Sequence, residues 1–251
     1  PDVKDIVKAR DDMLSPEWHP KYQAFYDLFV PAVLKNGLKF RMNEGSSFSK
    51  GGALGASDTY SASLWILDYL YWWAHHSASG LNFHSGQKVL PGTVGPDKPN
   101  VYTPLTSSEG GYTILPPGYG IKMFELGGHG ELLPVAVEKN KEKVNLVAYG
   151  VVPSPGVVNV TLINREYGPE GRGAEVTVDL GRGVGSGRVV KMEQESGEVS
   201  AVGGVQVGGK SFTEDGKWSG DWSALKQKAK GNELRILVGP STALVLQVTL
   251  K

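Results

Sequence analysis

Residues 38–52 read Leu38-Lys39-Phe40-Arg41-Met42-Asn43-Glu44-Gly45-Ser46-Ser47-Phe48-Ser49-Lys50-Gly51-Gly52. Apolar Phe40 and Met42 alternate with two basic residues, which predicts a short strand with one apolar face. Glu44 follows at the strand end, before a loop of small residues. A carboxylate at the end of a strand, followed by a glycine-bearing loop and a helix, is typical of the catalytic groups of α/β barrels. A solvent-exposed glutamate is the alternative, because most glutamates are exposed.

Two amphipathic helices are expected before this strand. Apolar residues recur at helical spacing over residues 3–14, and a second helix begins near Lys21. Pro31 is expected to kink the second helix, and Asn36-Gly37 to end it. The side chains expected to face inward from it are Tyr22, Phe25, Leu28, Phe29 and Val33.

A longer apolar helix is expected after the loop. Ser57-Asp58 favours a helix start, because serine caps helix N-termini and the helix dipole favours an acidic residue in the first turn. The apolar pattern continues to about Ala78 and covers a wide face. Such a face suits a helix that packs on a sheet and is covered by a further layer. Its aromatic residues could bind a sugar, but core packing is the favoured interpretation.

A second short strand is predicted at residues 80–84, again followed by polar residues. Residues 87–117 form a long stretch rich in Gly, Pro, Ser and Thr, which is typical of a functional loop or a lid. A short helix at 119–126 then ends at Gly127-Gly128. Two parallel strands cannot close a barrel. The order helix, strand, helix, strand, helix therefore indicates the last units of a longer (β/α)8 barrel.

From Leu132 onward the hydrophobic period changes to two, which predicts an antiparallel β-sandwich. The fold class is therefore α/β plus all-β, with a barrel portion at residues 1–130 and a β-sandwich domain at residues 131–251. The predicted strands are residues 133–138, 144–152, 157–166, 174–180, 188–195, 205–207, 233–238 and 243–250.

Composition narrows the function classes. The 251 residues carry 26 basic and 26 acidic side chains, so the net charge gives no reason to expect nucleic acid or an anionic membrane as a partner. No apolar run approaches the roughly 20 residues of a spanning helix, which predicts a soluble chain. The absence of cysteine excludes disulfides and thiolate metal sites. Adjacent His75 and His76 do not share a helix face, so neither metal nor cofactor is expected. A start at Pro1 indicates a mature or truncated product.

Several segments resemble glycoside hydrolase family 79, the heparanase and β-glucuronidase family. The likeness is specific between residues 41 and 126 and is architectural beyond them, where the family's β-sandwich would account for the chain. The segments that carry it are Arg41-Met42-Asn43-Glu44-Gly45-Ser46-Ser47, Gly51-Gly52, Ala56-Ser57-Asp58, residues 62–65 and 67–70, Gly80-Leu81-Asn82-Phe83-His84-Ser85-Gly86, residues 101–105 and residues 117–124.

The resemblance implies retaining hydrolysis by two glutamates, with Glu44 at the position of the nucleophile. That mechanism needs a second carboxyl group about 5 Å away, to protonate the leaving oxygen and later to activate water. Asp58 and Asp68 lie on the long helix, and Glu109 in the long loop is a weak candidate. The resemblance therefore places the acid/base in barrel strands outside this sequence. We expect the isolated chain to be inactive.

The resemblance also implies a site for the carboxylate of a uronic acid. Tyr102 matches a family tyrosine, and Gly51 and Gly52 match the glycines of a loop whose backbone N–H groups suit an anion. A second family tyrosine is replaced by Ser49, and Lys50 could supply the lost donor as a point charge. Asn82 and His84 are candidates to line the site, and His84 could equally have a structural role.

The sequence thus predicts a fragment of a retaining β-glucuronidase-like glycosidase that carries the nucleophile and lacks the acid/base. The expected partners are a glycan or glucuronide substrate and a missing N-terminal barrel segment or oligomeric partner. We expect a secreted or extracellular location. The alternative is a non-catalytic carbohydrate-binding or structural protein derived from this fold.

Overall fold

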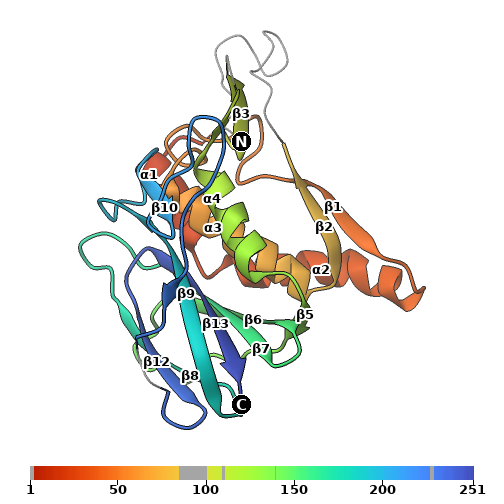
Figure 1. The fold of residues 1–251 in the computed structure, drawn as a ribbon. Helices are drawn as coiled ribbons and strands as arrows, with labels where there is room; N and C mark the ends of the chain where they lie inside the picture. The colour runs from red at the N-terminus through yellow and green to blue at the C-terminus, as the bar shows by residue number, and fades with distance from the viewer. Residues whose placement is uncertain (1–2, 85–100, 109–110, 139, 227–228) are drawn as a thin grey trace.

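The computed structural model describes residues 3–84, 101–108, 111–138, 140–226 and 229–251. Four helices lie in these ranges: α1 (Ile6–Leu14), α2 (Trp18–Lys35), α3 (Tyr60–His75) and α4 (Pro116–Gly127). A large antiparallel sheet packs against α3 and α4, and a small parallel sheet lies at the side of α3 (Figure 1). The mixed α/β character and the large antiparallel sheet agree with the sequence prediction. None of the helices described is long and apolar enough to cross a membrane.

Helix α3 is the centre of the molecule. Every side chain from Tyr60 to Trp73 is buried. One side, which includes Leu67 and Tyr71, packs against α4 and the large sheet, and the other, which includes Trp65 and Trp73, packs against α2 and the parallel sheet. The predicted two-sided packing of this helix is confirmed, and its aromatic residues are core.

The predicted ends of α3 were wrong by a few residues. Thr59 occupies the N-cap position, while the hydroxyl oxygen of Ser57 accepts hydrogen bonds from the Ala53 N–H and from Ser47. Ser57 therefore stabilises the preceding loop instead of capping the helix. At the other end the helix stops at His75, because Ser77 adopts a left-handed backbone with φ 69° and Ala78 already begins the next strand.

The parallel sheet consists of β1 (Phe40–Gly45) and β2 (Ala78–Phe83). Phe40 and Met42 of β1 face the helices, as the alternation predicted. The pairing carries two irregularities. Between the partners Met42–Leu81 and Gly45–Phe83, β1 has one residue more than β2, which is the count of a β-bulge.

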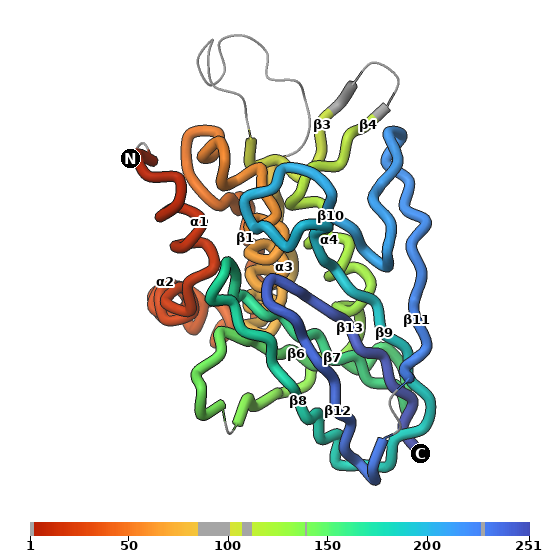
Figure 2. Tube along the Cα trace, turned by 90° about the vertical axis from the view of Figure 1, so that its left-hand side faces the viewer, coloured from red at the N-terminus to blue at the C-terminus, as the bar shows by residue number. Residues whose placement is uncertain are grey.

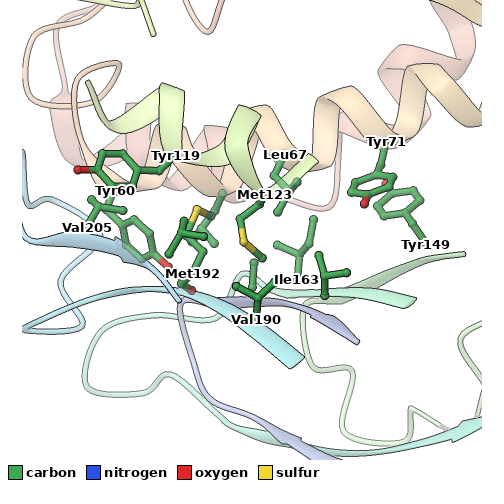
Figure 3. Packing of buried hydrophobic residues seen from close by; sticks show 14 of the residues in the cluster. Tyr60, Leu67, Tyr71, Tyr119, Met123, Tyr149, Ile163, Val190, Met192 and Val205 are labelled. Carbon is green, nitrogen blue, oxygen red and sulfur yellow. Dashed lines mark hydrogen bonds between the residues drawn. The ribbon is translucent and has the colours of Figure 1, made fainter. Parts of the chain in front are cut away.

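The large sheet has the strand order β10-β9-β13-β7-β6-β5, with β11 beside β9. Its strands are β5 (Glu131–Leu133), β6 (Leu146–Ser154), β7 (Val157–Asn164), β9 (Val184–Gln194), β10 (Val205–Val207), β11 (Ser223–Ala224) and β13 (Thr242–Leu250). Strands β8 (Ala174–Asp179) and β12 (Glu233–Val238) pair separately and cover one face. The opposite face packs on the helices, where Ile163 and Met192 of the sheet lie in one cluster with Met123 of α4 (Figure 3).

Three further predictions were corrected. Residues 134–138 are not strand, and β5 instead ends at Leu133. Part of the long loop is a hairpin of β3 (Leu105–Ser108) and β4 (Gly111–Ile114). This hairpin projects at the same end of the molecule as the loop after β1 (Figure 2). Residues 87–100 of the long loop lie outside the described ranges. Phe25, Leu28 and Phe29 of α2 are exposed rather than inward. Tyr22 and Val30 are the buried residues of this helix, and Trp18 and Tyr26 pack partly buried against the core.

Candidate active site

Glu44 lies near the carboxyl end of β1, on the side away from the helices. Strict alternation would place it on the same face as Met42, against α3. The extra residue in β1 before Gly45 shifts the phase, so that Gly45 faces Tyr69 and Phe83 while Glu44 is exposed on the open face. The bulge therefore exposes the carboxylate instead of burying it against α3.

His84, immediately after β2, meets Glu44 at this edge. Its Nε2 lies 2.8 Å from Oε1 of Glu44. The side chains of His84 and Glu44 are 46% and 69% exposed, so both are open to a ligand. An ionised carboxylate only accepts hydrogen bonds, so the geometry assigns the proton to Nε2 of His84. The second carboxylate oxygen of Glu44 has no hydrogen-bond partner among the described residues.

Tyr102 is the third member of the cluster. Its ring lies 5.3 Å from the ring of His84, centroid to centroid. Partial burial raises the pKa of Tyr102, and the negative charge of Glu44 raises it further, because both disfavour a phenolate. The structure thus brings together Glu44, His84 and Tyr102, three residues that the sequence predicted for one site.

The glycine loop lies beside this cluster. The Val101 N–H donates to the Gly51 carbonyl oxygen at 2.7 Å, which ties the segment of Tyr102 to the loop. Gly51 and Gly52 have φ values of 86° and 98°, which favour glycine. The Gly52 N–H donates to the Ser49 carbonyl and is engaged in the turn. Lys50 is exposed in the same turn, with a φ of 58°.

Asn82 was expected to line the site, but its side chain is hydrogen-bonded to Arg41. Its Oδ1 accepts hydrogen bonds from Nε and Nη2 of Arg41, at 3.1 and 2.5 Å. The guanidinium lies over Gly80, where an added Cβ would approach Nη1 to 2.5 Å. Asn82 and Arg41 therefore form a separate polar pair on the exposed face of the parallel sheet. Sequence reasoning missed this pair, although Arg41 shares the polar face of its strand.

None of the acidic side chains in the described ranges shares a hydrogen bond with Glu44. Asp58 accepts from the Gly55 N–H in the loop. Asp68 points to the large sheet, where it binds Arg165, His19 and Tyr149. Glu109 lies outside the described residues. Within those residues there is also no group of three or more metal-ligating side chains.

The buried cluster around Asp68 was not predicted. Asp68 and Arg165 are both nearly fully buried and are joined at 2.7 Å. Burial alone would raise the pKa of Asp68, but the Arg165 charge and the hydrogen bonds from His19 and Tyr149 hold it below its ordinary value. An acidic residue in the middle of an otherwise apolar helix was the signal available in the sequence.

No protein-family model matches the sequence, and no curated protein is similar to it in sequence. Solved structures do match its fold. A 4-O-α-L-rhamnosyl-β-D-glucuronidase from Fusarium oxysporum 12S has a TM-score of 0.73 and 22% identity, over 96% of this chain and 50% of that one. An α-L-arabinofuranosidase from Thermotoga maritima has a TM-score of 0.61 and 12% identity, over 99% and 51%.

A family 44 xyloglucanase from Paenibacillus polymyxa also matches, with a TM-score of 0.53 and 14% identity, over 93% of this chain and 35% of that one. The chain therefore spans about half or less of the length of these structures. At these identities the likeness concerns the fold alone. The chain has a fold found within glycoside hydrolases.

Proposed function

We propose that this chain carries the nucleophile half of the active site of a retaining glycoside hydrolase of the heparanase and β-glucuronidase type, family 79. Glu44 is the nucleophile. The observation that carries the proposal is the meeting of Glu44 and His84 at the carboxyl ends of two adjacent parallel strands. Side chains at the carboxyl ends of parallel barrel strands form the active sites of such enzymes. The glycosidase fold of the matched structures supports the same assignment.

The contacts of Glu44 fit a nucleophile. His84 donates to Oε1 and fixes the orientation of the carboxylate, which leaves the other oxygen to attack the anomeric carbon. The leaving oxygen must take its proton from a second carboxylic acid about 5 Å away. Water then attacks the glycosyl ester, and the second carboxylate accepts its proton. In this proposal that carboxyl group comes from barrel strands outside this chain, so the isolated chain does not turn over substrate.

The proposed substrate class is a β-linked glucuronide or a related glycan. The Tyr102 hydroxyl and the Lys50 ammonium would bind the sugar carboxylate, as a hydrogen-bond donor and a point charge. Gly51 and Gly52 allow the backbone to approach the sugar closely. Asn82 is held by Arg41 and is not assigned a direct contact with the sugar. The antiparallel part corresponds to the β-sandwich of such enzymes, and we propose a secreted or extracellular location.

The test needs active material, which is the polypeptide or assembly that contains this sequence in its natural source. A mechanism-based glucuronide inhibitor should form an ester on the peptide that contains Glu44, detected by mass spectrometry. Glu44→Gln should lower the turnover of an aryl β-glucuronide by roughly three orders of magnitude or more. Glu125→Gln is the control, because Glu125 pairs with Lys122 on α4. Equal activity of wild type and Glu44→Gln would refute the assignment.

A non-catalytic carbohydrate-binding or structural protein is the second candidate. It is favoured by one observation: the described acidic residues considered for the second role are engaged elsewhere, Asp58 with the Gly55 N–H and Asp68 with Arg165. This candidate predicts that the isolated chain binds a glucuronide by calorimetry and that the natural-source material does not hydrolyse it. Glycan binding that appears only together with turnover would eliminate it.

A further inference from the structure

A row of polar side chains crosses the large sheet on the face that packs against the helices. Arg188 of β9 pairs with Gln247 of β13, and Gln247 pairs with Asn159 of β7. Val190 and Val245, two residues from Arg188 and Gln247 on the same strands, belong to the core under the helices, so the row lies on that face. The row runs from exposed Arg188 to buried Asn159, and it begins beside β11, on the side of the molecule away from α2 (Figure 2).

The row is one chain of hydrogen bonds that fixes the guanidinium of Arg188. Asn159 Nδ2 donates to the Gly127 carbonyl oxygen at 3.1 Å, and Gln247 Nε2 donates to Asn159 Oδ1 at 3.0 Å. Gln247 Oε1 then accepts from Arg188 Nε at 2.8 Å. The ring of Trp222 stacks on the guanidinium, with 4.5 Å between Arg188 Cζ and the ring centroid. Two different contacts therefore hold Arg188 in one place.

The outer edge of this guanidinium is unused. Among the described residues, Nη1 and Nη2 of Arg188 have no hydrogen-bond acceptor, and no carboxylate pairs with this side chain. A carboxylate against this edge would accept two parallel N–H···O bonds, which is the strong geometry for an arginine–carboxylate pair. Because Trp222 and Gln247 already orient the side chain, less conformational entropy is lost when such a ligand binds.

A second cation lies on the same face. The Leu225 N–H donates to the Gly187 carbonyl oxygen, which continues the pairing of β11 with β9 by one residue. The Leu225 side chain packs in the core on the other face of the sheet, so the alternation of an extended chain turns Lys226 toward the face of Arg188. Lys226 is exposed and has no ion-pair partner in the part of the chain that the structure describes. An anion at Arg188 would therefore meet two cations without a counter-charge.

Hydroxyl and amide groups lie beside the two cations. Thr249 follows Gln247 by two residues on β13, so both side chains lie on this face, and Thr249 is exposed. Gln247 is half-buried, and its one hydrogen bond as a donor within the described ranges goes to Asn159. These groups suit a ligand that carries carboxylates and hydroxyls together. A uronic acid residue of a glycan has both, whereas a run of Asp and Glu residues offers carboxylates alone.

We propose that Arg188, Lys226, Gln247 and Thr249 form a second glycan-binding site, on the large sheet, for a saccharide that contains uronic acid residues. Arg188 binds one sugar carboxylate through Nη1 and Nη2, and Lys226 binds a carboxylate further along the same saccharide. Gln247 and Thr249 bind sugar hydroxyls. The choice of a uronic acid rests on the proposed function. The site would hold an acidic glycan on the protein while Glu44 acts on one of its residues.

Arginine footprinting tests the site. The polypeptide or assembly that contains this sequence is prepared with Glu44→Gln, so that the saccharide is not hydrolysed, and is treated with phenylglyoxal. At about ten times its half-protecting concentration, a β-linked tetraglucuronate should slow the modification of Arg188 about tenfold, because only about one site in ten is then empty. Arg235 on β12 is the control, because its side chain is 72% exposed and its modification rate should not change. Failure of the tetraglucuronate to protect Arg188 would overturn the proposal.

Three further ligands decide the chemistry of the site. The same tetrasaccharide with its carboxyl groups reduced to alcohols should leave Arg188 reactive. Inorganic sulfate and a tetraglutamate peptide should each need an at least about tenfold higher concentration for half-protection, because neither offers carboxylates and sugar hydroxyls together. Protection by the reduced saccharide would show that the cations are not used. Protection by sulfate or the peptide at the same concentration would show a general anion site or a peptide site. Each of these results would overturn the proposal.

A pair of lysine substitutions tests the second cation. Lys226→Gln should raise the half-protecting concentration of tetraglucuronate about threefold, as expected for the loss of one exposed ion pair. Lys191→Gln is the matched control, because Lys191 is exposed on β9 three residues from Arg188, which places it on the opposite face of the sheet. Equal effects of the two substitutions would show that net charge attracts the saccharide without a defined site, which would overturn the proposal.

The outcome for this site is separable from the outcome for the proposed function. Turnover of an aryl β-glucuronide is measured on the same polypeptide or assembly with Glu44 intact. Protection of Arg188 without turnover would refute only the proposed function. Turnover together with an unprotected Arg188 would refute only the second glycan-binding site.

Discussion

The charge of Glu44 acts on Tyr102, and this coupling can be measured in the isolated chain. Burial first, and the carboxylate second, raise the pKa of the Tyr102 phenol. In Glu44→Gln the second cause is removed while the burial remains, so the pKa of Tyr102 should fall toward its ordinary value of about 10. Carbon-13 NMR of labelled tyrosine follows this titration. Glu125→Gln should leave the pKa of Tyr102 unchanged. An unchanged pKa in Glu44→Gln would show that the charge of Glu44 does not act on Tyr102.

Asp68 is the residue on which the junction of helices and sheet depends most. It joins α3 to Arg165 beyond the end of β7 and to Tyr149 of β6, and all three side chains are buried. Asp68→Asn leaves the Arg165 cation buried without its counter-charge, which should cost about 3–5 kcal/mol of unfolding free energy. Asp12→Asn is the matched control, because the exposed pair of Asp12 with Lys8 should contribute at most about 1 kcal/mol. Urea unfolding at neutral pH measures both.

The same carboxylate makes stability depend on pH in a defined direction. The pKa of Asp68 is lower in the folded chain than in the unfolded chain, where it is about 3.9. Its contribution is therefore fully present above about pH 4 and is lost as the pH falls through the folded value. Between pH 7 and pH 3 the wild type should lose more stability than Asp68→Asn. Parallel losses in the two proteins would contradict the assigned shift, because their other carboxylates are identical.

At the scale of elements, the close approach of α3 and α4 depends on one glycine. A Cβ at Gly120 would lie 2.3 Å from the Ser63 carbonyl oxygen and 2.4 Å from a methyl group of Ile66. Gly120→Ala should therefore push the helices apart and cost about 1–3 kcal/mol. Gly203→Ala serves as the control, because nothing lies within 4 Å of an added Cβ there. Equal unfolding midpoints for the two variants would show that α4 can shift freely on α3.

The hydrophobic pattern of the sequence predicted the positions of helices and strands better than it predicted which of their faces are buried. The period of two predicted β7 and β12 closely, and the wide apolar face predicted α3 between two layers. The inward face predicted for α2 was right for Tyr22 and wrong for Phe25, Leu28 and Phe29, because hydrophobic periodicity shows which face would be buried but not whether a partner is present. The bulge that exposes Glu44 could not be predicted, because one extra residue in a strand leaves no mark in the alternation. The arrangement of Glu44, His84 and Tyr102 was predicted only through the family resemblance.

For the whole molecule, the stripe of exposed apolar side chains on α2, formed by Phe25, Leu28 and Phe29, has a consequence for the isolated chain. Exposed apolar side chains beside an open strand edge promote association, so sedimentation velocity should show a larger average mass as the concentration of the chain rises. Leu28→Glu places a charge in the stripe and should weaken this association without loss of folded structure, because Leu28 is 74% exposed. Leu237→Glu is the matched control on β12, where Leu237 is 65% exposed outside the stripe. An equal effect of the two substitutions would locate the association elsewhere on the surface.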